Sequence, residues 1–533
     1  MRFSLKPLLA FATVLGLAVA LIAPALAAGD RGAGNARGFS PLLSVQQGMS
    51  RPLRELPPAA TAAGRSPRQL TVKHPGHGGG SGNTDSAVQS SATVPLGATV
   101  TESFQGVGVT NSIPPDPNGS AGATEFVETV NSRMTVFSKS YPNSPILGPI
   151  AINSLWSAYA APCAGTDVSD PVVLYDKQAG QWVLMQLASV SAAPYYVCVA
   201  VSATSDAAGA WYLYAYNFGN SLPDYPKLGV WPDGYYFAVN DFYLGSSFQG
   251  AAACVLPRST MLTGGSGNGQ CYYNSASVAS LLPADLDGDV PGVSSTTGPP
   301  PAGTPGMFMN FGTNSLNLFQ YHVDWGNLNN STWTGPISKA VPSFSQACGG
   351  GTCVPQAGTS QQLASLGDRL MFRLSYRNFL GTNGYQSMVV NQSTVGSGTA
   401  AVRWYELRNP TSTGFTVYQA SSYAPDSTYR WMGSVAQDRL ADIAAGYSAS
   451  SSSISPQIRY TARAVNDPLN TLRAEATVPI TTASQTNYNR WGDYTSMSVD
   501  PTDDCTFWYT NEYQRTTGYY WSTWVTAFKM PGC

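Results

Sequence analysis

Charged residues are scarce in this sequence. Asp, Glu, Lys and Arg together make up 11% of the 533 residues, and the formal net charge is only −2. About a quarter of the residues of an average soluble domain are charged. A basic surface for nucleic acid or for an anionic membrane is therefore not expected. The sequence predicts neither of these partners.

Histidine is rarer still, with three residues in the whole chain. His74 and His77 lie in a Gly-rich tract that is either a solvated linker or a short metal-binding tract, and His322 lies in an expected strand. This count excludes a histidine-rich metal centre. A Ser-His-Asp triad would have to use His322, and the chain has no Gly-x-Ser-x-Gly motif. Nor does it have a C-x-x-C spacing that would indicate structural zinc.

Only the N-terminus carries a long apolar run. Arg2 and Lys6 precede apolar residues 7–22, and Ala25-Leu26-Ala27 then offers a small-x-small cleavage site. This pattern predicts a signal peptide over residues 1–27 and a secreted mature protein. An uncleaved membrane anchor is the alternative, but the run is short for a span. No later stretch is long and apolar enough to cross a bilayer.

The eight cysteines fit an exported protein. Each has a close neighbour in the sequence, so each pair could close a local loop or hairpin in an oxidising compartment. Eight cysteines allow 105 pairings, and neighbour pairing is the hypothesis adopted here. A cysteine nucleophile is disfavoured because every thiol has a plausible partner. The expected disulfides are Cys163 with Cys198, Cys254 with Cys271, Cys348 with Cys353, and Cys505 with Cys533.

Two regions follow the signal peptide. Residues 28–98 are rich in Gly, Ser and Pro and have no sustained apolar periodicity, which predicts a disordered leader or propeptide. Residues 99–533 show short alternating apolar runs between turn signals, which is typical of β-hairpins. A four-stranded blade takes on the order of 40–70 residues. The sequence therefore predicts an all-β, disulfide-stapled β-propeller domain over residues 99–533, with six or seven blades.

Two turn segments indicate an internal repeat. Residues 204–211 and 498–508 each place a hydroxyl residue, an Asp and then an aromatic around a turn. The Asp side chain would cap turn amides while the aromatic packs between sheets. Both turns resemble degenerate Asp-boxes of sialidase-type propellers, although the first has an inserted residue and the second lacks the Gly. Residues 224–236 and 490–500 also resemble segments of a poorly characterised group of secreted bacterial proteins.

Carboxylates and tyrosines remain as candidates for catalysis. In glycoside hydrolysis, a carboxylic acid protonates the leaving oxygen while a carboxylate or an activated Tyr acts as base or nucleophile. Each candidate interrupts or opens an apolar strand, and each could instead be a turn cap or a surface charge. The candidate catalytic residues are Asp116, Asp170, Asp241, Glu406, Asp493, Tyr494 and Glu512.

Arginines beside aromatic residues are candidates for substrate binding. Arg369, Arg373 and Arg377 occur every four residues, so a strand would place all three on one face. Such a face could bind a carboxylated or sulfated sugar, or the arginines could pair with acids between blades. Of these three, Arg373 and Arg377 are the stronger candidates. The other predicted binding residues are Arg430, Trp431, Arg490 and Trp491.

One acidic loop could bind a metal. Asp285, Asp287 and Asp289 alternate in a Gly-containing segment, a pattern that suits calcium. The loop is not an EF-hand, because the sixth and twelfth positions are Val290 and Thr296 instead of Gly and Glu. A solvated surface turn is the alternative. No cofactor is expected to be required, and calcium is the one candidate.

Taken together, these features predict a secreted, monomeric propeller that acts on an extracellular polysaccharide or glycoconjugate at one end of its channel. The first hypothesis is a sialidase-like glycoside hydrolase. A non-catalytic carbohydrate-binding or surface-interaction module is the alternative, and a carboxylate-dependent secreted peptidase is a third. Because a fold does not determine a function, the choice depends on the geometry of the site.

Overall fold

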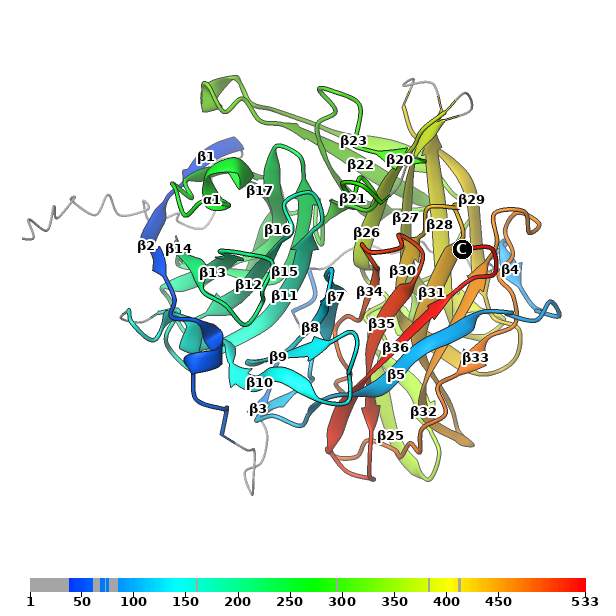
Figure 1. Cartoon of the computed structure of the whole chain (residues 1–533). Coiled ribbons are helices and arrows are strands. Elements are labelled where there is room, and N and C mark those ends of the chain that lie inside the picture. The colour runs from blue at the N-terminus through cyan, green and yellow to red at the C-terminus, as the bar shows by residue number, and fades with distance from the viewer. Residues whose placement is uncertain are drawn as a thin grey trace, which may run out of the picture.

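The computed structural model describes residues 38–60, 68–71, 73–75, 85–159, 162–293, 296–381, 384–410 and 414–533. The predicted signal peptide over residues 1–27 lies outside these ranges. In the described residues no helix is long and apolar enough to cross a membrane. The structure is nearly all β, as the sequence predicts (Figure 1).

Sheets of four strands, each running outward from a central channel, form the blades. The first three blades follow one another in the chain. Blade 1 holds β7 (Asn118–Ala121), β8 (Glu125–Val130), β9 (Arg133–Ser138) and β10 (Pro145–Ala151). Blade 2 holds β11 (Val168–Asp176), β12 (Gln181–Ala188), β13 (Tyr195–Ser202) and β14 (Trp211–Gly219). Blade 3 holds β15 (Ser221–Trp231), β16 (Gly234–Tyr243), β17 (Ser247–Leu256) and β18 (Gly269–Tyr273).

The other blades repeat this order up to the C-terminus. Blade 4 holds β19 (Leu282–Leu286), β21 (Gly306–Gly312), β22 (Ser315–His322) and β23 (Thr332–Ala340). Blade 5 holds β26 (Leu370–Phe379), β27 (Tyr385–Gly396), β28 (Thr399–Asn409) and β29 (Thr416–Tyr423). Blade 6 holds β30 (Tyr429–Gln437), β31 (Ile443–Ser451), β32 (Ile454–Arg463) and β33 (Ala476–Thr477). Blade 7 holds β34 (Ser496–Val499), β35 (Phe507–Gln514), β36 (Trp521–Lys529) and β5 (Thr99–Gly108).

The inner strands close a ring. In order around it, β7, β11, β15, β19, β26, β30 and β34 each contact the next, and β34 returns to β7. Inner strands β19 and β26 pair in parallel, which joins blades 4 and 5 into one large sheet. Strand β5 comes before blade 1 in the chain and pairs with β36, so that blade 7 contains both ends of the ring (Figure 1). The fold is a seven-bladed β-propeller.

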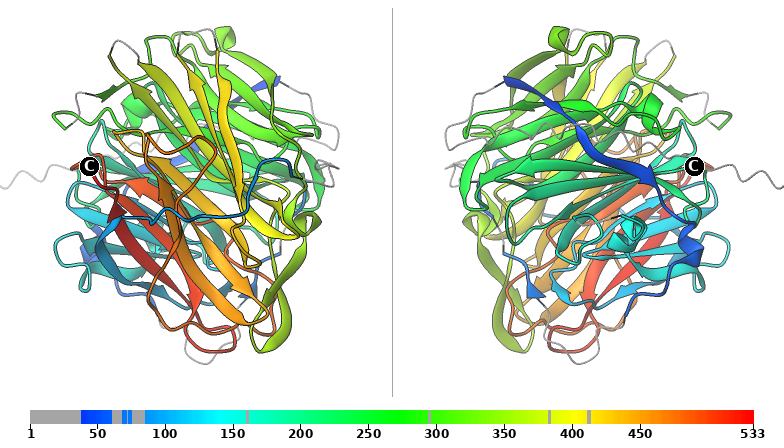
Figure 2. Two further views of the ribbon diagram at one scale, coloured as in Figure 1. Left: turned by 90° about the vertical axis from the view of Figure 1, so that its right-hand side faces the viewer. Right: turned by 90° about the vertical axis from the view of Figure 1, so that its left-hand side faces the viewer.

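Residues before the propeller domain also pair with blades. Strand β1 (Gly38–Leu42) pairs with β18, β2 (Ser44–Met49) pairs with β14, and β4 (Val88–Gln89) pairs with β29. Figure 2 shows the dark blue N-terminal strands along the outside of the green blades. The predicted disordered leader over residues 28–98 is therefore wrong for the described part of that segment. These strands are held by backbone pairing while their side chains stay half exposed, so they lack the apolar periodicity of a core strand.

Short elements complete the chain. Strand β3 (Arg68–Gln69) pairs in parallel with β6 (Ser112–Ile113). Strands β24 (Thr352–Gln356) and β25 (Thr359–Ala364) form a hairpin, and β20 (Thr297–Gly298) joins β26. The helical turns are η1 (Leu53–Glu55), η2 (Ile152–Trp156), α1 (Arg258–Met261), η3 (Leu328–Asn330) and η4 (Ala347–Gly350).

All four predicted disulfides are confirmed. Cys163 pairs with Cys198, Cys254 with Cys271, Cys348 with Cys353, and Cys505 with Cys533. Cys254 and Cys271 face each other across β17 and β18, as expected for neighbours in adjacent strands.

Candidate active site at the channel mouth

A pocket of about 360 Å³ opens at the end of the channel where the inner strands begin. Its walls come from blades 1, 2, 3, 5 and 7, because each contributes the residues at or just before the start of its inner strand. The polar side chains fall into two groups of opposite charge. The acidic group is Asp116, Asp170, Asp224 and Asp493, and the basic group is Arg68, Lys73, Arg369 and Arg490.

A repeated backbone feature places the acids of blades 1 to 3. Asp116, Asp170 and Tyr225 each precede a proline and each have a positive φ, at 52°, 52° and 56°. The pairing register of β11 and of β15 shifts at these points. A non-glycine residue in this region of backbone space is uncommon, and such strain is concentrated at functional sites. The repeat brings Asp116, Asp170 and Asp224 to the same mouth.

Asp116 is held rigidly beneath the pocket. Its Oδ1 accepts a hydrogen bond from the backbone N of Asp493 at 2.7 Å, and its Oδ2 accepts one from Asn131 Nδ2 at 2.7 Å. Burial raises the pKa of Asp116 well above its usual value, and the negative charges of Asp493 and Asp170 raise it further. The charge of Arg490 and the hydrogen bond from Asp493 N oppose this shift.

Asp224 has the property of a general acid at neutral pH. Burial, followed by the nearby charge of Asp170, raises the pKa of Asp224 to about 7, while Arg369 opposes the shift. A group with this pKa is about half protonated at pH 7, so it can donate a proton there. Asp224 is not among the site residues predicted from the sequence.

Asp493 differs from these acids because it has a cationic partner. Arg490 Nη2 forms an ion pair with Asp493 Oδ1 at the pocket wall. Behind it, Glu512 Oε2 accepts a hydrogen bond from Gly492 N at 2.7 Å. Burial raises the pKa of Glu512 well above its usual value, and the charge of Asp116 adds to this. The site thus combines an ion-paired carboxylate with buried carboxyls whose pKa values are raised.

A buried lysine lies under the same acids. The Nζ of Lys227 is 3.6 Å from the ring centre of Tyr225 and 3.7 Å from that of Tyr494, which is a double cation–π arrangement. Burial lowers the pKa of Lys227 to about 7, against the opposing charge of Asp170. Tyr494 donates a hydrogen bond to Pro171 O at 3.2 Å. This layer supports the floor of the pocket.

Several predicted residues therefore meet at one site. Asp116, Asp170, Asp493 and Arg490 line the pocket, and Tyr494 and Glu512 lie directly behind them. Arg369, the weaker of the three arginine candidates, lines the pocket as well. The Asp-Pro dipeptides at residues 116–117 and 170–171, with the related residues 224–226, are the sequence signal that could have identified Asp224.

Two predicted catalytic carboxylates lie elsewhere. Glu406 is fully buried in β28, where Arg408 Nε is 2.6 Å from its Oε1 and Gln419 binds its other oxygen. Asp241 is buried in β16, opposite Pro223 and one strand outward from the pocket wall. Neither lines the pocket. Both are polar residues buried inside a blade, which sequence alone does not distinguish from a catalytic position.

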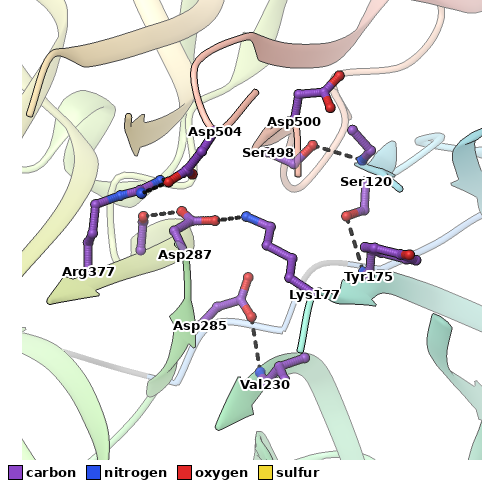
Figure 3. Close-up of polar contacts among 12 residues, drawn as sticks. Ser120, Tyr175, Lys177, Val230, Asp285, Asp287, Arg377, Ser498, Asp500 and Asp504 are labelled. Atoms are coloured by element: carbon purple, nitrogen blue, oxygen red, sulfur yellow. Dashed lines mark hydrogen bonds and ion pairs between the residues drawn. The ribbon is translucent and has the colours of Figure 1, made fainter. Parts of the chain in front are cut away.

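Arg373 and Arg377 belong to a buried ion-pair network away from the pocket, and Figure 3 shows Arg377 beside Asp504 in this network. Arg373 lies 2.8 Å from Asp285 and 2.6 Å from Asp287, while Arg377 makes two bonds of 2.7 and 2.8 Å to Asp504. The prediction that these arginines bind substrate is wrong, because their donors are used by acids from other blades.

The remaining predicted binding residues are also structural. Arg430 is buried and pairs with Glu475 at 2.7 Å. Trp431 and Trp491 are buried with their ring centres 5.8 Å apart, in a core cluster that also contains Met371 and Ala400 of blade 5. None of them lines the pocket. An Arg-Trp pair suits packing between blades as well as sugar stacking, and here the first explanation holds.

The acidic segment at the end of β19 does not fit calcium. Asp287 contacts Lys177, as Figure 3 shows. Asp287 and Asp285 both contact Arg373, and Asp289 accepts a hydrogen bond from Gln178. The side chains of Lys177 and Arg373 therefore already neutralise the two buried carboxylates, Asp285 and Asp287. Among the described residues no three His, Cys, Asp or Glu side chains group as metal ligands. The predicted calcium site therefore has no support in this geometry.

The two predicted turn motifs act as caps. Asp206 Oδ1 accepts from Ala208 N at 3.0 Å, and Asp500 Oδ1 accepts from Thr502 N at 2.8 Å. Trp211 and Trp508 are buried after these turns. The first turn joins the third and fourth strands of blade 2, whereas the second joins the first and second strands of blade 7. They are therefore not equivalent positions of one repeat.

A carboxyl near the buried network permits a pH prediction. Asp438 is fully buried, and burial followed by the charge of Asp442 raises its pKa to about 8. Because the unfolded value is about 4, the wild-type protein loses stability as the pH rises from about 4 toward 8. Asp438→Asn removes this loss and keeps an Oδ1 that accepts from Leu440 N and Asp442 N. We expect the variant to gain up to about 5 kcal/mol in urea unfolding at pH 8 and almost nothing at pH 4. Equal stability of the two proteins at both pH values would contradict this.

The similarities of this chain to known proteins are weak and do not identify its family. No family model matches the chain. No curated protein matches it. Among solved structures, the WD40 domain of SCAP from fission yeast is 8% identical, with a TM-score of 0.32 over 76% of this chain and 82% of that one.

Two further solved structures are similar at the same level. An exo-β-1,3-galactanase from Clostridium thermocellum is 11% identical, with a TM-score of 0.32 over 69% of this chain and 82% of that one. A subtype N10 neuraminidase-like protein of A/little yellow-shouldered bat/Guatemala is 8% identical, with a TM-score of 0.34 over 70% of this chain and 99% of that one. The closed ring of inner strands, and not these likenesses, identifies the fold.

Proposed function

We propose that this protein is an exported glycoside hydrolase whose active site is the pocket at the channel mouth. The observation that carries the proposal is the set of four acids that line one pocket, where Asp224 has a pKa of about 7 and Asp493 is ion-paired with Arg490. Glycoside hydrolysis requires such a pair, with one carboxyl that donates a proton and one carboxylate that acts as base or nucleophile. The four disulfides fit an extracellular location.

Each residue then has a role. Asp224 protonates the leaving oxygen of the glycosidic bond, and Asp493 activates water or attacks the sugar from the opposite side. Arg369 and Arg490 supply guanidinium donors for an acidic or hydroxyl-rich substrate. Asp116 holds the backbone of Asp493 in place through their 2.7 Å hydrogen bond, and it is therefore a positioning residue.

The test is an array of neutral, uronic and sialylated extracellular polysaccharides. Retained binding and released reducing ends are read in the same wells. Release from one polymer that is lost in Asp493→Asn supports the proposal. Binding without release would instead make the protein a carbohydrate-binding module. Neither binding nor release from any polymer would overturn the glycan assignment.

A further inference from the structure

A short N-terminal segment lies across the mouth of this pocket. We call residues 68–71 and 73–75 the strap. Arg68, Gln69, Leu70, Thr71 and Lys73 all line the pocket, although they lie far in the sequence from the blades that form its walls. Arg68 N donates to Asn111 O at 2.6 Å and Leu70 N donates to Ile113 O at 2.7 Å, so the strap is docked against β6.

The strap uses the same arginines that a substrate would need. Arg490 Nη1 donates to the backbone O of Leu70, and Arg369 Nη2 donates to the backbone O of Lys73 at 3.0 Å. These guanidinium groups are ligand-binding donors in a polar pocket, and part of their capacity is used by the chain itself. The strap therefore occupies positions where oxygen atoms of a bound sugar would bind.

Further contacts hold the strap to both rims of the pocket. Lys73 Nζ donates to Gly245 O at 2.6 Å in blade 3, and His74 Nδ1 lies 2.8 Å from Asp368 Oδ2 in blade 5. Arg68 Nη1 lies 2.6 Å from Asp167 Oδ1 in blade 2. The strap thus bridges the mouth from one blade to another.

These contacts are individually weak. The side chains of Arg68 and His74 are 45% and 48% exposed, and ion pairs between exposed side chains contribute little. The strap has little apolar anchoring, since Leu70 is half-buried and Pro75 alone is buried. Segments with few buried apolar contacts open locally at low cost. The strap can leave while the seven blades stay folded.

We infer that the strap is a built-in occupant of the active-site pocket that restrains access until it is displaced or cut. The inference rests on the proposed function for the identity of the substrate, but the blockage itself can be tested without any glycan. A strap released by proteolysis would free Leu70 O and Lys73 O from the two arginines and open the mouth to solvent.

The test uses a single introduced thiol on the full chain. All eight cysteines are in disulfides, so Ser169→Cys, at the pocket wall, gives the one reactive thiol. Recognition sequences for a specific protease are placed in residues 61–67 and 77–83, on both sides of the strap. The rate of maleimide labelling is measured before and after cutting and removal of the peptide. We expect the rate to rise by roughly tenfold or more.

Matched variants make the result interpretable. Ser452→Cys, on an exposed turn of blade 6, must label at the same rate in cut and uncut protein. Arg68→Ala with His74→Ala loosens the strap without cutting, and it should raise labelling of the Ser169→Cys thiol in part. Unchanged labelling in both the cut and the loosened protein would overturn the inference. Faster labelling with no glycan turnover would support the inference about the strap and contradict the proposed function.

Discussion

Asp224→Asn is expected to lower kcat on the responsive polysaccharide by roughly 10²–10⁴-fold, the usual contribution of a general acid. The amide cannot donate the proton that the leaving oxygen needs, whereas it keeps the size of the side chain. KM should change little, because substrate binding depends on Arg369, Arg490 and the pocket shape. Initial rates of reducing-end release over a range of substrate concentrations separate the two parameters.

The pH profile distinguishes this role from a structural one. The wild-type rate should fall as the pH rises through about 7, because the pKa of Asp224 lies there and the acid form is the active form. Asp224→Asn should lose this alkaline limb along with most of its activity. Glu55→Gln, at an exposed carboxylate in η1, serves as the control and should keep both rate and profile. Full activity of Asp224→Asn would exclude Asp224 as the acid.

The sequence predicts the propeller well because the blades depend on local signals. Alternating apolar runs and turn residues mark each hairpin, and neighbouring cysteines such as Cys254 and Cys271 face each other in adjacent strands. The edge strands β1 and β2 could not be predicted from these local signals. Their pairing is made by backbone groups, and Val45 and Met49 remain 56% and 47% exposed. A segment without a buried face gives no periodic signal.

The site is predicted only in part, for a similar reason. Asp116, Asp170 and Asp493 could be proposed because turn residues surround them. Arg377 could not be assigned correctly, since the sequence does not show that Asp504, 127 residues later, neutralises it across the channel. The spacing of Arg373 and Arg377 predicts a shared face, but it does not tell which charges lie opposite.

Arg377→Met is expected to destabilise the protein by about 3–5 kcal/mol, because it leaves Asp504 buried without its partner. Both carboxylate oxygens of Asp504 bind this guanidinium, at 2.7 and 2.8 Å, and both side chains are fully buried. Asp504→Leu should cost a similar amount, since it leaves a buried cation. Urea unfolding, compared at equal m-values, measures the loss.

The double variant Arg377→Met with Asp504→Leu decides the cause of that loss. Replacing a whole buried pair by apolar residues is often neutral, so most of the stability should return. Arg54→Ala, at an exposed ion pair with Asp206, is the control and should change stability by less than about 1 kcal/mol. A double variant as unstable as the single ones would mean that the pair is needed for its geometry. In that case the contact from Arg377 to Gln437 O at 3.0 Å, which joins blades 5 and 6, would account for the loss.

Asp287, which forms ion pairs with Arg373 and Lys177 in the same network, should make the protein less stable at acidic pH. Burial alone would raise the pKa of Asp287, but the positive charges of Arg373 and Lys177 outweigh it and lower the pKa below its usual value. The stability from this group is therefore complete above the unfolded pKa of about 4, and it is lost as the pH falls through the lower folded value. Blades 2, 4 and 5 meet in these contacts, at the end of the channel opposite the pocket. Unfolding by acid should accordingly begin with the inner strands parting at this end, while disulfides still cross-link blades 2, 3 and 7 internally.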